Sequence, residues 1–546
     1  MIRYDIYRLL ILTRLEIQET ALNNLTFTKF ILSLALLSNI SCAIKEKKSG
    51  NKSTSSNHAP YEDEAFQYES ANNDSTSVDS ADYQTSPGQV MSEEEKLEGD
   101  DQEAVKNEFI NTSEEDTSTF SIDVDTASYT LARQLINSQI LPTPQQIRTE
   151  EFINYFKYEY PEPADESPFA VSLESMPAPW QAEHQLLKIG IQGKDIDISS
   201  RPMSNLVFLL DVSGSMSAAN KLGLIKHGLT MMTEHLTEND RVAIVVYAGA
   251  AGVVLESTTG DQQEKIIGSL AQLQAGGSTN GSQGIELAYK IAVENKIEGG
   301  INRVILGTDG DFNVGPSSTE ALNSLIIEKA ATGIELSVLG VGMGYMGDHK
   351  MESLANKGNG NYYYLDSQSE AERVLTEELS GTLQTIAKDV KLQISFTPEK
   401  VASYKLIGYE NRRLANEDFD DDTKDAGELG AGHTVTALYE IKLAEGVSEL
   451  DSDSVNLQLR YKQPGSDESQ LLEASNVLNQ ASTEDFNFIN AVTAFALKLK
   501  NSSDVESFSF DAIIELAGGL DNANQSEERQ EFVGLVEKVK SLSEQE

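Results

Sequence analysis

Short apolar runs alternate with amphipathic helical segments between residues 184 and 379, and this alternation constrains the fold more than any other feature. A strand that is followed by a helix reaches the next strand by a crossover connection, which makes neighbouring strands parallel. We therefore expect an α/β fold in which a mostly parallel sheet is covered by helices on both faces. The strands are expected at 184–193, 205–211, 241–249, 253–255, 303–310, 334–342 and 362–365.

Oxygen-bearing side chains gather where these strands end. The stretch "DVSGS" places Asp211, Ser213 and Ser215 at alternate positions, so that three oxygen atoms can point to one side of an extended segment. "GGSTNG" carries Thr279 just ahead of a helix, and "GTDG" carries Asp309 at the end of another strand. Ligands of open α/β sheets bind beyond the carboxyl ends of the strands. We therefore expect these five residues to form one site.

The proposed ligand set has two carboxylates, three hydroxyls, and no nitrogen or sulfur. Such a set suits Mg²⁺, Mn²⁺ or Ca²⁺ and argues against Zn²⁺ or Cu²⁺. Two carboxylates balance a divalent charge, and five protein groups leave a coordination position for a further ligand. Taken alone, "DVSGS" is also compatible with an ordinary Asp/Ser helix cap.

The arrangement resembles the von Willebrand factor type A domain and its metal-ion-dependent adhesion site. Ser213, Ser215 and Thr279 match the hydroxyl ligands of that family, and Asp211 and Asp309 match its carboxylates. The resemblance covers about residues 204–383, whereas Asp311 falls outside the pattern. It implies a Rossmann-like domain whose cation is bound by a carboxylate of a partner protein.

The flanking segments "FSIDVDTASYT" and 406–441 resemble YfbK-type bacterial proteins. This resemblance implies a von Willebrand-associated region, the type A domain and a C-terminal domain of unknown function. Four stretches after residue 384 alternate polar and apolar residues as half-buried antiparallel strands do, and amphipathic helices are expected at 485–502 and 527–542. We expect the three folded parts at 119–183, 184–383 and 384–546.

Two further groups of acidic residues have simpler explanations. Asp123 and Asp125 lie two residues apart, on a short strand expected at 121–125, without an evident third oxygen ligand, so we interpret them as structural contacts. The run Asp420–Asp422 lacks the glycine and the distal glutamate of a calcium-binding loop, which favours a solvated turn.

The single cysteine, Cys42, closes the stretch "KFILSLALLSNISC", which has one positive charge and an apolar run too short to span a bilayer. This stretch resembles a bacterial lipoprotein signal, in which the cysteine is lipidated; an ordinary cleaved signal would leave a free thiol. We assign 1–42 to an N-terminal extension and signal peptide, and 43–118 to a disordered acidic tether. Ala43 favours the outer membrane of the cell envelope.

The net charge and the residues of the proposed site limit the functions that this chain can have. The net charge of −45 disfavours nucleic acid as a partner. A metal-dependent hydrolase needs a general base or nucleophile, and we expect the site loops to carry no His, Lys or Cys. We therefore expect no enzymatic activity and favour adhesion or complex assembly at the cell envelope. A structural envelope protein, in which the metal only stabilises the domain, is the alternative.

Overall fold

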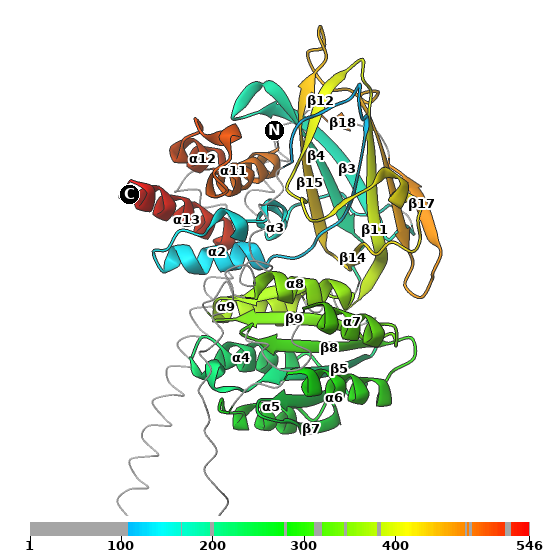
Figure 1. Cartoon of the computed structure of the whole chain (residues 1–546), viewed down its shortest axis with the longest axis vertical. Helices are drawn as coiled ribbons and strands as arrows, with labels where there is room; N and C mark the ends of the chain where they lie inside the picture. Colours follow the sequence, from blue (N-terminus) through cyan, green and yellow to red (C-terminus); the bar gives the residue numbers. More distant parts are fainter. Residues whose placement is uncertain are drawn as a thin grey trace, which may run out of the picture. The chain divides into compact units, whose positions relative to one another are not determined.

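The computed structural model describes residues 107–544, except for 165, 197–200, 278–280, 311–318, 343–346, 379–383, 475–477, 480–482 and 519–525. Cys42, Thr279 and Asp311 lie outside the described residues, as does the expected tether as far as residue 106. Three six-stranded sheets make up the β structure of the described chain (Figure 1).

One sheet belongs to an α/β domain and has the strand order β10-β9-β8-β5-β6-β7. Five of its strands are parallel, and only the edge strand β7 pairs antiparallel, with β6. The expected α/β class with a mostly parallel sheet is therefore confirmed. The strands are β5 (Ser204–Asp211), β6 (Arg241–Tyr247), β7 (Ala251–Thr259), β8 (Ile301–Thr308), β9 (Glu335–Val341) and β10 (Tyr362–Leu365).

Helices cover both faces of this sheet because successive side chains of each strand point in opposite directions (Figure 1). Leu206, Phe208 and Leu210 of β5 pack in one core with α4, α5 and α9, whereas Val207 and Leu209 pack in another with α6, α7 and α8. The helices are α4 (Leu222–Thr233), α5 (Gln263–Gln272), α6 (Gly281–Glu294), α7 (Thr319–Ala330), α8 (Asp348–Lys357) and α9 (Gln368–Glu372), and the π-helix η5 (Arg373–Glu378) follows α9.

The other two sheets enclose a separate apolar core to which both contribute, for example through Phe120 and Ile189. Their orders are β1-β12-β15-β4-β3-β18 and β13-β2-β11-β16-β17, with β14 beside β11. The strands before the α/β domain are β1 (Ile110–Asn111), β2 (Thr117–Ser121), β3 (Phe169–Ala178) and β4 (Gln181–Gly193). Those after it are β11 (Thr385–Phe396), β12 (Val401–Ile407), β13 (Arg413–Leu414), β14 (Gly427–Gly430), β15 (Thr434–Leu443), β16 (Val455–Lys462), β17 (Ser469–Glu473) and β18 (Leu478–Asn479).

Helices from both ends of the described chain share a further core that includes many aromatic rings. They are α2 (Ala127–Asn137), α3 (Thr149–Asn154), α11 (Glu484–Leu499), α12 (Phe510–Leu516) and α13 (Glu527–Ser543). Phe156, which follows α3, packs edge-on against Phe488 of α11 and Phe532 of α13. Within the part of the chain described here, no helix combines the length and the apolar character needed to cross a bilayer.

The structure differs from the sequence expectations at the start of the α/β domain. The strand expected at 184–193 lies in β4, which pairs with β3 and β15 instead of the parallel sheet. The parallel sheet therefore begins at β5, and the α/β domain is inserted between β4 and β11 of one antiparallel body.

Two expectations near the N-terminal boundary also differ from the structure. Part of the segment expected to be disordered is ordered, because Ile110 pairs with Tyr404 of β12 and the Thr112 hydroxyl donates to the Val401 carbonyl at 2.5 Å. The strand expected at 121–125 ends at Ser121, since its ladder with β11 covers only 117–121.

Candidate metal centre

Asp211 is the last residue of β5, a strand in which every residue is buried. Its carboxylate oxygen Oδ1 accepts a hydrogen bond from the backbone amide of Ser213 at 2.7 Å. This contact turns the chain directly after the strand and fixes the carboxylate at the carboxyl edge of the sheet. The side chain of Asp211 is fully buried, although it is a charged residue.

The two serines of the "DVSGS" stretch lie together after this turn. The hydroxyl oxygens of Ser213 and Ser215 are 2.9 Å apart, and a 3-10 helix (Gly214–Ser217) holds the second of them. The Gly214 amide donates to the Gly277 carbonyl at 3.0 Å, so the "GGSTNG" loop begins beside the serines. Thr279, the hydroxyl expected from that loop, lies outside the described residues.

Asp309 directly follows β8, which neighbours β5 in the sheet. Its carboxylate Oδ2 accepts a hydrogen bond from Lys221 Nζ at 2.8 Å, and the Asp309 side chain is only 2% exposed. Lys221 comes from the loop that carries the two serines and directly precedes α4. The sequence expectation that the site loops supply no lysine is therefore wrong. No sequence pattern marked this lysine, because its partner Asp309 lies 88 residues further along the chain.

The electrostatics of the centre are set by burial. Burial raises the pKa of Asp211, and the neighbouring charge of Asp309 raises it further, while hydrogen bonds from Ser213 act in the opposite direction. Burial and the charge of Asp211 raise the pKa of the Tyr247 hydroxyl well above its usual range. Tyr247, the last residue of β6, is therefore a neighbour of the centre that the sequence pattern did not indicate.

The second carboxylate oxygen of Asp211, Oδ2, is buried and accepts no hydrogen bond of ordinary geometry from the described residues. A buried carboxylate oxygen without a donor is costly unless a cation compensates it. The neighbouring groups include the Ser213 and Ser215 hydroxyls and the Asp309 carboxylate, whose oxygens are ligands that Mg²⁺, Mn²⁺ and Ca²⁺ prefer, as well as the Lys221 ammonium group on Asp309. The residues at this edge of the sheet therefore fit a hard divalent cation.

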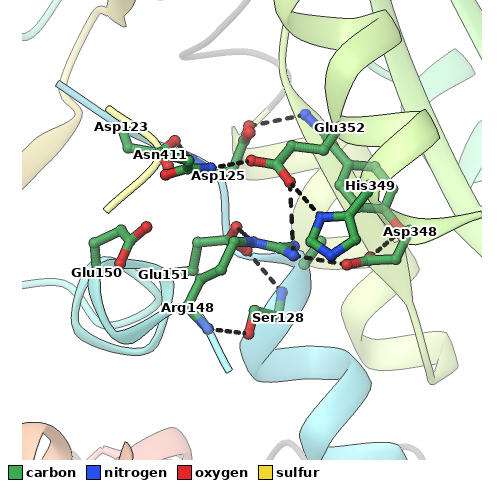
Figure 2. A network of polar contacts seen from close by, with 12 residues as sticks. Asp123, Asp125, Ser128, Arg148, Glu150, Glu151, Asp348, His349, Glu352 and Asn411 are labelled. Atoms are coloured by element: carbon green, nitrogen blue, oxygen red, sulfur yellow. Dashed lines mark hydrogen bonds and ion pairs between the residues drawn. The ribbon is translucent and has the colours of Figure 1, made fainter. Parts of the chain in front are cut away.

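A second polar cluster connects the α/β domain to the antiparallel body, and it is centred on Arg148 (Figure 2). Arg148 forms ion pairs with Glu151 and, at 2.7 Å, with Asp348, the first residue of α8. Glu352 of α8 accepts a hydrogen bond from the Asn411 amide at 2.7 Å. No group of three or more His, Cys, Asp or Glu residues placed to hold a metal occurs in the described ranges.

Asp123 and Asp125 belong to the same region and serve as structural contacts. Arg412 pairs with Asp123 at 3.0 Å and with Asp125 at 3.3 Å. Asp125 also accepts a hydrogen bond from the backbone amide of Tyr362, which lies in β10 of the α/β domain. The interpretation of these two residues as structural agrees with the contacts. The run at 420–422 likewise pairs within the body, for example through Arg460 and Asp420.

Glu150 is the member of the cluster (Figure 2) with the weakest compensation. It is fully buried, and its Oε2 accepts a single hydrogen bond, from the Tyr409 amide at 3.0 Å. Its Oε1 has no partner among the described residues. Burial, together with the charges of Glu410 and Asp123, raises the pKa of Glu150 to about 7. No sequence pattern marks this residue.

Three family profiles match consecutive parts of the chain. The profile described as "von Willebrand factor" matches residues 96–188, and the profile "von Willebrand factor type A domain" matches 205–378. The profile "Uncharacterized protein YfbK, C-terminal" matches 381–542. The second of these begins at β5, where the parallel sheet begins in the structure.

Two proteins are also similar to this chain in sequence. The Escherichia coli K12 protein "Uncharacterized protein YfbK" is 40% identical over 444 residues, which covers 77% of each protein. The Synechocystis protein "Uncharacterized protein sll0103" is 27% identical over 186 residues, covering 34% of this chain and 43% of that protein. A solved structure, "von Willebrand factor type A from Catenulispora acidiphila", covers 68% of this chain and 86% of its own, with 15% identity and a TM-score of 0.38.

Proposed function

Because this chain belongs to the YfbK family of von Willebrand factor type A domain proteins, we propose that it binds a partner protein through a divalent cation. Asp211, Ser213, Ser215, Thr279 and Asp309 would hold Mg²⁺, Mn²⁺ or Ca²⁺ at the carboxyl edge of the parallel sheet. The bound cation would supply an open coordination position, which a carboxylate of the partner can occupy.

One observation carries this proposal. Asp211 Oδ2 is a buried carboxylate oxygen that accepts no hydrogen bond of ordinary geometry from the described residues, although the Tyr247 hydroxyl is a neighbour of this carboxylate. The Ser213 hydroxyl follows it on the same turn. If this position only filled the core, we would expect an apolar residue. If it only capped a helix, its oxygen would accept a hydrogen bond from a backbone amide. The neighbouring oxygen Oδ1 already makes that backbone contact, which leaves Oδ2 available for a cation.

The charge of the chain supports a metal-mediated contact with an acidic partner. With a net charge of −45, the protein repels carboxylates in the absence of a cation. A divalent ion at the centre would reverse this repulsion locally. Binding of an acidic side chain should therefore depend steeply on the cation.

A non-catalytic function fits the side chains of the centre better than a hydrolytic one. Lys221 is the basic side chain placed there, and it is engaged by the carboxylate of Asp309. An ammonium group has no free electron pair with which to accept a proton from water, whether it pairs with Asp309 or stands beside a bound cation. We therefore propose that the centre binds and does not catalyse.

We further propose that the protein is attached to the bacterial cell envelope, in the outer membrane, by a lipid on Cys42. The sequence that precedes this cysteine supports the proposal, as described above. Replacement of Cys42 by serine should release the protein into the soluble fraction of fractionated cells. Retention of the C42S variant in membranes would contradict lipid anchoring without affecting the proposal for the metal centre.

The metal proposal is tested by titration calorimetry of the full chain with Mn²⁺ after treatment with chelator. Wild-type protein should bind one ion, and Asp211→Ala should lose this binding while its circular dichroism spectrum is retained. The matched control is Asp453→Ala, which removes an exposed carboxylate from the antiparallel body. Equal binding by wild type and the D211A variant would rule out the assigned ligands.

The partner proposal is tested by capture from membrane extracts, with tagged wild-type protein in Mg²⁺ or in chelator. Specific partners should be retained in Mg²⁺, and lost in chelator and in the Asp309→Ala variant. Identical partners under all three conditions would contradict metal-mediated binding. A metal that only stabilises the domain would then be the better explanation.

A further inference from the structure

We infer that Lys221 is an internal cation that occupies Asp309 in the metal-free protein, and that a divalent cation must displace it to bind. This inference rests on the metal centre proposed above and concerns how that centre is loaded. Its basis is that Lys221 Nζ donates to Asp309 Oδ2 at 2.8 Å, so the ammonium group takes up an oxygen atom of a proposed metal ligand.

The position of Lys221 is built into the fold. Its side chain is 20% exposed, and the carboxylate that it reaches is 2% exposed. Its methylene groups run beside Gly342, directly after β9, where φ is +89°. A Cβ atom at position 342 would overlap these methylene groups, so glycine leaves the space through which the lysine reaches Asp309.

The charges of the centre make metal and lysine competitors. Asp309 cannot give full ligand strength to a divalent ion while the same oxygen atom accepts from an ammonium group. Two cations in contact with one carboxylate also repel each other. In contrast, Asp211 Oδ2 forms no ion pair and no hydrogen bond of ordinary geometry with the described residues, so one of the two carboxylates can bind a cation before the lysine leaves.

Replacement of the lysine by a cation links metal binding to the connection between β5 and α4. This connection carries the Ser213 and Ser215 hydroxyls as well as Lys221, which directly precedes α4. A cation that replaces the ammonium group therefore frees a side chain at the mouth of the centre. The displaced lysine then places a positive charge at the rim, where an acidic partner would approach. The lysine thus lowers metal affinity and keeps the empty centre from carrying two uncompensated carboxylates.

Titration calorimetry with Mn²⁺ on the full chain tests the competition. Lys221→Met retains the methylene stem and removes the charge, so it should bind Mn²⁺ about tenfold more tightly than wild type, or better. The matched control is Lys226→Met, in α4, the helix that Lys221 directly precedes. Lys226 Nζ donates to the Ala271 and Leu273 carbonyls, so its loss removes an equal charge without freeing a metal ligand. The K226M variant should bind like wild type.

Amine labelling with mass spectrometric readout gives a second measurement that needs no variant. Saturating Mg²⁺ should increase the labelling rate of Lys221 severalfold and leave that of Lys226 unchanged. If a cation binds but does not change the labelling rate of Lys221, the inference is overturned.

The outcomes separate this inference from the proposal on which it rests. Displacement is supported if K221M binds Mn²⁺ more tightly than wild type, or if K221M binds Mn²⁺ and wild type does not. Equal binding by folded wild type and K221M, with loss in D211A, overturns displacement and leaves the metal centre intact. Absence of Mn²⁺ binding in both wild type and K221M overturns the metal centre and the inference together. Lys221→Gln repeats the comparison if K221M does not fold.

Discussion

Arg148 Nη1 lies 2.7 Å from Asp348 Oδ2, and this ion pair joins the segment before the α/β domain to the first residue of α8. Arg148 also pairs with Glu151 and lies 3.6 Å from Glu352. A single buried guanidinium group therefore compensates three buried carboxylates that belong to two parts of the structure (Figure 2).

Replacement of Arg148 by methionine should destabilise the protein by about 3–5 kcal/mol, because it leaves these carboxylates buried without their cation. Chemical denaturation followed by circular dichroism measures the change. The control is Lys290→Ala, which removes an exposed pair with Glu294 and should cost less than about 1 kcal/mol. A loss in R148M no larger than in K290A would show that the network does not hold the two parts together.

A pH dependence follows from Glu150. Its folded-state pKa of about 7 lies above the usual value of 4.5, so between these values the folded protein binds a proton that the unfolded chain has lost. Stability contributed by protonated Glu150 is therefore full below pH 4.5 and falls as pH rises towards 7, by up to about 3 kcal/mol. Glu150→Gln should remove this fall and still accept the hydrogen bond from the Tyr409 amide.

The measurement is the free energy of unfolding of wild type and E150Q from pH 5 to 8. Burial lowers the pKa of His433 to about 4, so this histidine makes stability rise between pH 4 and 6.5 in both proteins. The difference between the two curves isolates Glu150, and Glu449→Gln, at an exposed position, serves as the control. Parallel curves for wild type and E150Q would contradict the raised pKa.

Local patterns in the sequence were sufficient to predict the α/β domain. The apolar run that ends in Asp211 is fully buried as β5, and helices such as α4 and α7 alternate with the strands as the pattern predicts. The period of apolar residues and the length of each apolar run can be seen in a short stretch of sequence. Strands that alternate with helices can be connected in only a few ways. The order of residues along the chain also brought Asp211, Ser213 and Ser215 to one edge of the sheet.

Pairing between distant segments could not be predicted in the same way. The stretch 184–193 looks like any half-buried strand, and its place in the antiparallel body depends in part on a ladder with β15, some 250 residues later. Lys221 and Asp309 are likewise 88 residues apart, and neither residue type identifies its partner. Arg148 reaches across 200 residues to Asp348. Partner choice depends on tertiary packing, which a single sequence pattern does not encode.

The glycine beside Lys221 gives a prediction about the path of that side chain. Gly342→Ala introduces a Cβ at a residue whose φ is +89°, which strains the backbone, and the same Cβ overlaps the methylene groups of Lys221. The variant therefore combines a backbone cost with a steric cost. Gly465→Ala has a φ of +84° with open space around the new Cβ, and it reports the backbone cost alone, about 1–2 kcal/mol. Denaturation should show a larger loss in G342A than in G465A.

The excess loss in G342A should depend on the lysine. In a double-mutant cycle, Lys221→Ala removes the atoms that the new Cβ would strike, so the cost of G342A should fall towards that of G465A. An equal cost of G342A with and without the lysine stem would show that position 342 does not define the path of Lys221.

The metal-free protein should fold without any divalent cation. Asp309 is compensated by Lys221, and Asp211 Oδ1 accepts from the Ser213 amide, so most of the polar groups at the centre have partners before a metal binds. Protein in excess chelator should therefore keep its circular dichroism spectrum and a cooperative thermal transition. Increasing Mg²⁺ concentration should raise the midpoint of the thermal transition. A ligand at about one hundred times its Kd adds about 2.7 kcal/mol to the free energy of unfolding. Asp211→Ala should abolish the rise while retaining the transition in chelator. Loss of the cooperative transition of wild type in chelator would instead mean that the cation is needed for the fold itself, and it would favour the structural function over metal-mediated binding of a partner.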